Sequence, residues 1–314
     1  MPHVTFIHGI ANKPKADDLL RDWKAELDGA GFNLGTRGVT SSLVYWADVM
    51  YDKPMSSSSS FESLDDGLGT EKKDEALDWV KNLDTPQKTV VASLIHKFGL
   101  DKAPPEEDRE AVPEQPMGED DPYAFEAIPL PWFIKERVMK RLLKDVHHYL
   151  FNERFSPRPG ETYHVQTELR QRFVGQLEHD KTHATGPFVV VAHSMGTVIS
   201  YDCLKNVASC PSIDGFMTVG SPLGLSEIHD NFDPDYNKRD AFPSSRVTRG
   251  WVNLYDRLDP VAFDAKIAND YQQNGQRLVQ DERVRNGGVW RHSSNKYFQQ
   301  DKLIAHLSNL LDLA

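Results

Sequence analysis

Short apolar runs alternate with amphipathic segments near the start of the chain. Residues 4–7 (VTFI) are typical of a β-strand, and Leu20, Trp23 and Leu27 then recur at the spacing of a helix. Residues 42–49 (SLVYWADV) again favour a strand. The order strand, helix, strand predicts the beginning of a parallel sheet with helices packed on it.

The same alternation returns in the second half of the sequence. Residues 188–191 (FVVV) are four consecutive apolar positions, three of them β-branched, which is typical of a strand buried on both faces. The fold class that follows is α/β, with a mostly parallel central sheet flanked by helices. The pattern predicts further strands at 215–219, 251–255 and, more weakly, 282–285, and helices at 162–180, at 197–208 and from about 300 onward.

The regular pattern lapses in the middle of the chain. This part contains a run of serines at 56–60, an acidic, proline-rich stretch at 102–122, and helical pieces at about 88–98 and after Pro131. The composition of residues 102–122 is typical of a mobile loop. We therefore expect an insertion placed over a regular scaffold.

Composition and charge narrow the class of protein. The chain has 314 residues, of which 39% are hydrophobic, enough for a sizeable core and too many for a wholly disordered chain. With 36 basic and 47 acidic residues the formal net charge is −11, which argues against nucleic acid and anionic membrane surfaces as partners. Residues 106–121 alone hold eight acidic residues and one arginine, so much of the charge belongs to that stretch.

No targeting or membrane-spanning segment is predicted. The apolar run at the N-terminus is too short for a signal peptide, and no stretch approaches the roughly 18 apolar residues of a membrane span. Cys203 and Cys210 form no disulfide or metal framework and are expected to be reduced thiols. We therefore expect a cytoplasmic protein, of an oligomeric state that the sequence leaves open.

The strongest candidate for chemistry follows the expected strand FVVV. The sequence AHSMG (192–196) runs directly into a helix, with the small residues Ala192 and Gly196 on either side of Ser194. A sharp strand-to-helix turn requires small flanking residues and raises the serine hydroxyl to the C-terminal edge of the sheet. It also brings the Met195 N–H to a helix N-terminus, where it stabilises negative charge. The alternative is an ordinary turn in which Ser194 caps the helix.

A serine nucleophile needs a carboxylate and a histidine base, in the chain order serine, acid, histidine. The strand WVNLY ends in Asp256 and Asp259, whose side chains would face the same sheet edge as the serine. Asp259 is preferred because the proline after it stiffens its loop, and Asp256 stays a rival. Of the two later histidines, His306 falls within the last amphipathic helix, whereas His292 lies in a loop. The pattern favours a triad of Ser194, Asp259 and His292.

A second donor for an oxyanion is expected from the loop after the first strand. His8-Gly9-Ile10 follows that strand, and the glycine allows the backbone to approach a substrate closely. The Ile10 N–H is therefore the candidate donor beside that of Met195.

Two weaker signals favour structural roles. Ser221, in the sequence GSP, has no helix-forming turn after it, which is typical of a structural loop. His179 and His183 stand i, i+4 on a helix but lack a metalloprotease motif, so a solvated face is the preferred interpretation. Since the chain also has no phosphate-binding glycine motif, we predict no cofactor and no metal.

Together these motifs resemble the α/β-hydrolase superfamily in its lipase/esterase-like branch. The resemblance rests on FIHGI, VVVAHSMGTVISYDCL, TVGSPLG, WVNLYDRLDPVA and RHSSNKY. Residues 1–51 and 160–314 are accordingly expected to form the catalytic core, and residues 52–159 the family's variable helical lid or cap, partly flexible around 102–122. The chain departs from the family in Ala192, which replaces the common glycine, and in starting at the His-Gly strand.

The resemblance implies a serine hydrolase that cleaves carboxylic esters through an acyl-enzyme intermediate. Thioesterases, amidases and acyltransferases use the same residues, and a non-catalytic binding protein on this fold is the alternative from a different class. The aromatic segments at 123–125 and 128–134 are expected to cover an apolar pocket for lipid-like esters, or else to pack on the core. The implied roles are nucleophile for Ser194, acid for Asp259, general base for His292, and oxyanion hole for the N–H groups of Ile10 and Met195.

Overall fold

The computed structural model describes residues 1–55, 77–101, 132–232, 236–287 and 290–313. At its centre is a six-stranded sheet in which every neighbouring pair of strands is parallel. The predicted α/β class with a parallel central sheet is confirmed. In sheet order the strands are β10 (Val279–Arg283), β7 (Val247–Tyr255), β6 (Ile213–Val219), β5 (Phe188–His193), β1 (His3–Ile7) and β2 (Thr40–Val44).

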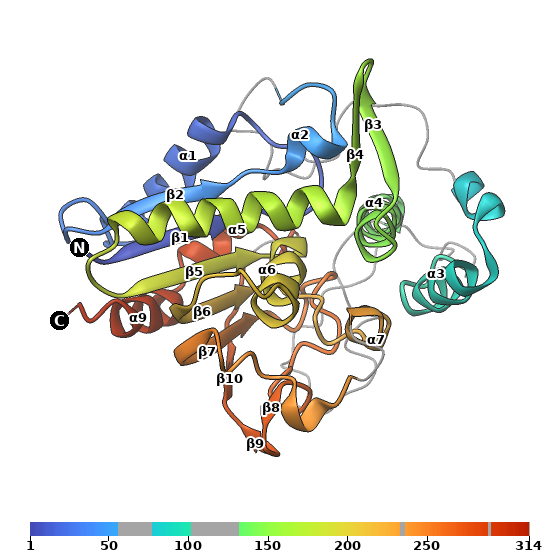
Figure 1. Ribbon diagram of the computed structural model, residues 1–314. Coiled ribbons are helices and arrows are strands. Elements are labelled where there is room, and N and C mark those ends of the chain that lie inside the picture. Colours follow the sequence, from blue (N-terminus) through green and yellow to red (C-terminus); the bar gives the residue numbers. More distant parts are fainter. Residues whose placement is uncertain (56–76, 102–131, 233–235, 288–289, 314) are drawn as a thin grey trace.

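Helices cover both faces of this sheet (Figure 1). Alternate strand residues point to opposite faces, and both sets are apolar, so each face needs a helical layer. On one face Phe6 and Val191 pack with residues of α1, α8 and α9; on the other, Val190 and Trp251 share a cluster with residues of α5 and α6. These helices are α1 (Ala16–Gly29), α5 (Val165–His183), α6 (Met195–Asn206), α8 (Ser294–Phe298) and α9 (Asp301–Leu310).

Two helices come from the segment predicted as a lid. These are α3 (Thr85–Lys97) and α4 (Trp132–Leu150); α4 packs against α5 and α6, and α3 packs against α4 and α7 (Ser226–Phe232) (Figure 1). The lid itself stays a prediction, since residues 56–76 and 102–131, which include the serine run, the acidic stretch and the aromatic segment 123–125, lie outside the described residues.

The remaining elements are short. They are α2 (Ala47–Met50), 3₁₀ helices at Leu77–Asn82 and Lys238–Asp240, an antiparallel hairpin of β3 (Arg154–Arg158) and β4 (Glu161–His164), and a second hairpin of β8 (Gln272–Gln273) and β9 (Gln276–Arg277).

The second predicted strand is shorter than the apolar pattern indicates. β2 ends at Val44 because the N–H groups of Trp46 and Ala47 donate to Nε2 of His8 at 2.9 and 3.2 Å. A side chain from the loop after β1 thus turns the chain out of the sheet and into α2. The helix expected from residue 162 begins at Val165, since the preceding residues form β4.

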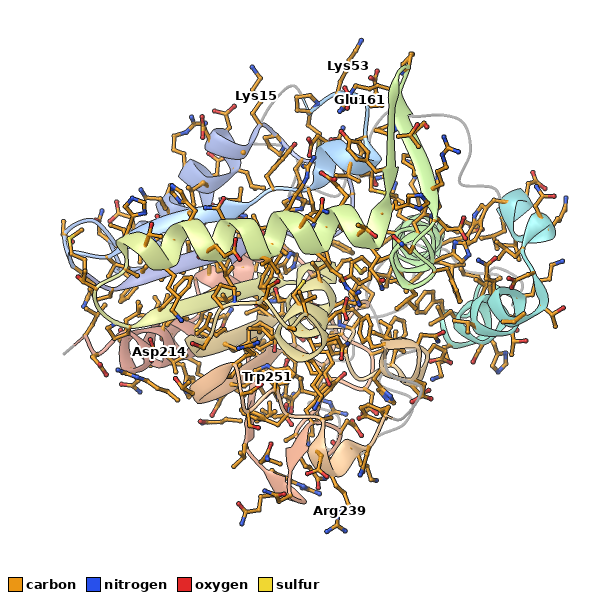
Figure 2. All side chains as sticks on the ribbon, in the orientation of Figure 1. Lys15, Lys53, Glu161, Asp214, Arg239 and Trp251 are labelled. Atoms are coloured by element: carbon orange, nitrogen blue, oxygen red, sulfur yellow. The ribbon has the colours of Figure 1, made fainter. Side chains whose placement is uncertain are left out.

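Figure 2 shows the contrast between the interior and the surface. Trp251 lies among the side chains of the core, whereas Lys15, Lys53 and Arg239 extend outward. The indole N–H of Trp251 donates to the Thr218 hydroxyl at 3.0 Å, so even this buried polar atom is satisfied. None of the helices in the described ranges combines the length and apolar character needed to cross a bilayer.

Candidate active site

The predicted site residues follow five strands whose C-terminal ends meet at one edge of the sheet. Gly9 follows β1, Ser194 follows β5, Gly220 follows β6, Asp259 follows β7 and His292 follows β10. This edge is where open parallel sheets place their ligand sites, because the connecting loops diverge there. The topology therefore brings together residues that are far apart in the sequence.

Ser194 occupies a sharp turn between β5 and α6. Its φ of 54° and ψ of −127° lie outside the regions that a serine normally adopts, and such a conformation costs of order 1–3 kcal/mol. The surroundings hold it: the Ser194 N–H donates to Val219 at 3.0 Å, and the Thr197 hydroxyl donates to the Ser194 carbonyl at 2.6 Å. Strain of this kind at a serine between a strand and a helix is typical of a nucleophile elbow.

Gly196, the small residue expected after the serine, is required by the close approach of the backbone. A Cβ placed on Gly196 would lie 2.7 Å from the carbonyl oxygen of His8 and 2.8 Å from that of Ile7. These are backbone atoms of β1 and its loop, which cannot move aside easily. A glycine is therefore required where α6 begins beside β1.

His292 is joined to Asp259 and not to Asp256. The His292 Nδ1 lies 2.9 Å from both carboxylate oxygens of Asp259, so Nδ1–H donates to that carboxylate. The N–H of Val261 also donates to Asp259, at 2.8 Å. Asp256 instead accepts the N–H groups of Leu258 and Asn286, at 2.8 and 2.6 Å. The geometry thus distinguishes the two aspartates that the sequence left as rivals.

The hydrogen bond between nucleophile and base is not formed in this structure. Ser194 Oγ and His292 Nε2 are both buried, and neither has a partner among the described residues. The backbone at Gly9 crowds the serine, since a Cβ there would lie 3.0 Å from Oγ. Catalytic hydrogen bonds are often long in unliganded enzymes and tighten when substrate binds, so the gap does not exclude the pair.

A second histidine, His193, supports the loop that carries His292. Its Nε2–H donates to the His292 carbonyl oxygen at 2.8 Å, and the two rings lie 4.6 Å apart. Burial, together with the nearby His292, holds the pKa of His193 well below its ordinary value. His193 is therefore neutral, and it positions His292 through its backbone rather than competing as a base.

The two expected oxyanion donors belong to the loop after β1 and to the start of α6. Met195 N–H is at the first turn of α6, where the helix dipole favours negative charge. Ile10 N–H lies in the loop after β1, which His8 anchors through its contacts with Trp46 and Ala47. Burial lowers the pKa of His8 well below its ordinary value, so its ring stays neutral and Nε2 remains an acceptor. Neither donor N–H meets an acceptor within the part of the chain that the structure describes.

The other residues singled out in the sequence analysis make structural contacts or lie away from the site. The Ser221 hydroxyl bonds that of Thr197 at 2.7 Å, which ties the loop after β6 to α6. His179 and His183 stack with ring centroids 4.8 Å apart on α5, and within the described ranges no group of three or more His, Cys, Asp or Glu could hold a metal ion. Cys203 and Cys210 are buried and free, as expected of reduced thiols.

Sequence analysis assigned no role to three residues near the site. Tyr297, on α8, donates its hydroxyl to Asp259 Oδ2 at 2.8 Å, and Lys13 and Asp145 both contact the loop after β1. Tyr297 ends the segment RHSSNKY, whereas Lys13 belongs to no motif and Asp145 lies on α4, outside the segments that resemble the hydrolase family. Only the three-dimensional structure brings them to the site.

No protein-family model matches the chain, and no curated protein matches it. The function is therefore inferred from the residues at the sheet edge and from their geometry.

Proposed function

We propose that the chain is a serine hydrolase of the α/β-hydrolase type that cleaves carboxylic esters. The observation that carries the proposal is the strained Ser194 at the start of α6, at the same sheet edge as the hydrogen-bonded pair His292 and Asp259. A serine that only capped the helix would accept a backbone N–H, and the Ser194 side chain makes no such cap. An unpartnered hydroxyl in a strained turn is what a nucleophile requires.

In the proposed reaction, Ser194 Oγ attacks the ester carbonyl while His292 Nε2 accepts its proton. The N–H groups of Ile10 and Met195 stabilise the negative oxygen that develops. Asp259 holds the imidazole so that Nε2 is the unprotonated nitrogen, and it stabilises the imidazolium. The proton then passes to the leaving alcohol, and water activated by the same histidine releases the acyl group.

The acyl and alcohol parts of the substrate stay open. Thioesters, amides and acyl transfer to another alcohol all proceed through the same acyl-enzyme. A preference for lipid-like esters rests on the segments 123–125 and 128–134, of which residues 123–125 and 128–131 lie outside the described residues. A panel of p-nitrophenyl esters of rising chain length measures this preference. A rise in kcat/KM with chain length would support an apolar acyl pocket.

The second candidate is a non-catalytic binding protein on the same fold, which the unmade bond between Ser194 and His292 favours. Labelling with a fluorophosphonate probe separates the two. We expect the wild-type chain to be labelled and Ser194→Ala not to be. The matched control is Ser200→Ala, because Ser200 is a fully buried serine of the same helix whose hydroxyl bonds none of the described residues. Absence of labelling on folded wild-type protein, or labelling that survives in Ser194→Ala, would contradict the proposal.

A further inference from the structure

Two charged side chains hold the peptide unit that joins Ile10 to Ala11, one at its carbonyl oxygen and one at its N–H. The Ile10 carbonyl oxygen accepts a hydrogen bond from Lys13 Nζ at 2.6 Å. The N–H of the same peptide unit, which belongs to Ala11, donates to Asp145 Oδ2 at 3.4 Å. Lys13 comes from the loop itself, whereas Asp145 reaches it from α4.

This peptide unit needs to be held because its backbone is strained. Ala11 has a φ of 68°, in the left-handed region that a residue with a Cβ adopts at a cost of about 1 kcal/mol. Since Ile10 O and Ala11 N–H are both engaged, the orientation of the plane between these residues is fixed. The Ile10 N–H belongs to the preceding peptide unit, which is joined to this plane through the N–Cα and Cα–C bonds of Ile10. The carbonyl of that preceding unit, Gly9 O, is itself hydrogen-bonded to His8 Nδ1 at 2.9 Å, and Gly9 packs against Ser194.

Both charged side chains are buried at a cost to stability. Lys13 is 8% exposed and Asp145 is 5% exposed. Burial raises the pKa of Asp145 to about 6, although the Ala11 N–H and the charges of Lys144, Arg141 and Lys13 act in the opposite direction. The two buried side chains thus meet one peptide unit away from the expected oxyanion donor, on an element and a loop that are far apart in the sequence.

We propose that Lys13 and Asp145 are positioning residues that fix the Ile10 N–H for the developing oxyanion. Through Asp145, α4 becomes part of the catalytic arrangement, so a helix outside the regular βα pattern controls the precision of the oxyanion hole. The inference rests on the proposed function, because it assigns these residues a role in the same hydrolytic site.

Three variants of graded severity test the proposal. Lys13→Met and Asp145→Ala each remove one contact to the peptide unit. For both we expect kcat for a p-nitrophenyl ester to fall about 10–100-fold while KM stays within about twofold. A misplaced N–H weakens the hydrogen bond to the oxyanion, which is made mainly in the transition state and contributes little to binding of the substrate. Asp145→Asn keeps a neutral acceptor of the same size, and the expected loss is about 3–10-fold. The affinity for a boronic acid, which forms a tetrahedral adduct with the serine, should fall in parallel.

The control is Lys140→Met, which removes a charge from the same helix, where Lys140 pairs with Glu136 at 2.7 Å, and should leave kcat within about twofold. Loss of melting temperature in Lys13→Met and Asp145→Ala with unchanged kcat and boronic acid affinity would show a merely structural role and overturn the proposal. If those two variants do not fold, Asp145→Asn decides, and a loss below about twofold overturns it. If instead the proposed function itself is wrong, the wild-type chain will neither react with a fluorophosphonate nor hydrolyse the ester.

Discussion

The buried hydroxyl of Tyr297 connects the two aspartates that follow β7. It accepts the Asp256 N–H at 3.0 Å and donates to Asp259 Oδ2 at 2.8 Å. Tyr297 lies on α8, only a few residues after His292, so one short segment carries both the expected base and a group that orients the expected acid. An oriented acid keeps the imidazole in one tautomer, and the contribution of this tyrosine can be measured.

Tyr297→Phe should lower kcat and not only the stability. The carboxylate of Asp259 would lose one hydrogen-bond donor, and it would then hold the His292 imidazole less firmly in one orientation. We expect a several-fold decrease in kcat together with a loss of about 1 kcal/mol in the free energy of unfolding. Steady-state rates with a p-nitrophenyl ester and urea unfolding measure the two effects.

Tyr271→Phe is the matched control for this variant. Tyr271 is equally buried and its hydroxyl donates to the Leu223 carbonyl at 2.7 Å, away from Asp259. Its removal should cost a similar free energy of unfolding and leave kcat within about twofold. An equal decrease in kcat in both variants would contradict a specific role for Tyr297.

At the scale of elements, α6 is tied to its neighbours by one buried carboxylate. Asp202 accepts the Tyr149 hydroxyl of α4 at 2.6 Å and two hydrogen bonds from the Arg170 guanidinium of α5, at 2.7 and 2.8 Å. The helix α6, which begins just after Ser194, is thereby joined to α4 and α5. This contact fixes the layer rather than the chemistry, because Asp202 lies two turns beyond the serine.

Asp202→Asn should therefore lower the free energy of unfolding and leave kcat/KM within about twofold at 25 °C. We expect a loss of about 2–3 kcal/mol, because the buried end of a charge pair is removed while Arg170 keeps partial access to water. Urea unfolding measures it, with Tyr149→Phe as a smaller perturbation of about 1 kcal/mol. A large fall in activity in the folded variant would instead link Asp202 to the site.

At the scale of elements, the sequence predicts most of the helices and strands but not all of their ends. The strands β1, β5, β6 and β7 and the helices α5, α6 and α9 follow from apolar periodicity, because burial on two faces leaves a continuous run of apolar residues and burial on one face leaves a stripe. The edge strand β10 has only one apolar residue, and it begins at Val279 rather than at the predicted 282.

The end of β2 does not follow from the pattern either, since a single side chain, His8, stops the strand by accepting two backbone N–H groups. Ser194, Asp259 and His292 could be named from motif and chain order. The contacts of Lys13, Asp145 and Tyr297 could not be predicted, because they are made only in the folded chain.

For the whole molecule, buried histidines make stability depend on pH. His147 on α4 is buried against Trp79 and Phe151, and burial, with the neighbouring His148, lowers its pKa to about 4. A histidine whose pKa is lower in the folded chain binds its proton preferentially when unfolded. Its contribution is therefore complete above about pH 6.5 and is lost as the pH falls from there toward 4.

His147→Phe should flatten this dependence. The unfolding free energy of the wild-type chain is expected to fall between pH 6.5 and 4 more steeply than that of the variant, because the variant has no imidazole to protonate at this position. Asp145 acts in the opposite direction, since its raised pKa favours the folded chain at low pH. Urea unfolding at half-unit pH steps measures the difference, and identical slopes would contradict the assignment to His147.

The position of β1 inside the sheet also determines when the chain can fold during synthesis. β1 is translated before β5, with which it pairs along His3 to Phe188 and Ile7 to Ala192, so this neighbour emerges only about 180 residues later. At about 5–20 residues per second, the interval is of order 10–40 seconds. For that time the nascent chain carries an unpaired apolar strand, because β1 and β2 alone are too small a sheet to be stable. The ribosome-bound chain should therefore depend on chaperones that bind exposed β-strands, and its core should form only once β5 and β6 have left the exit tunnel.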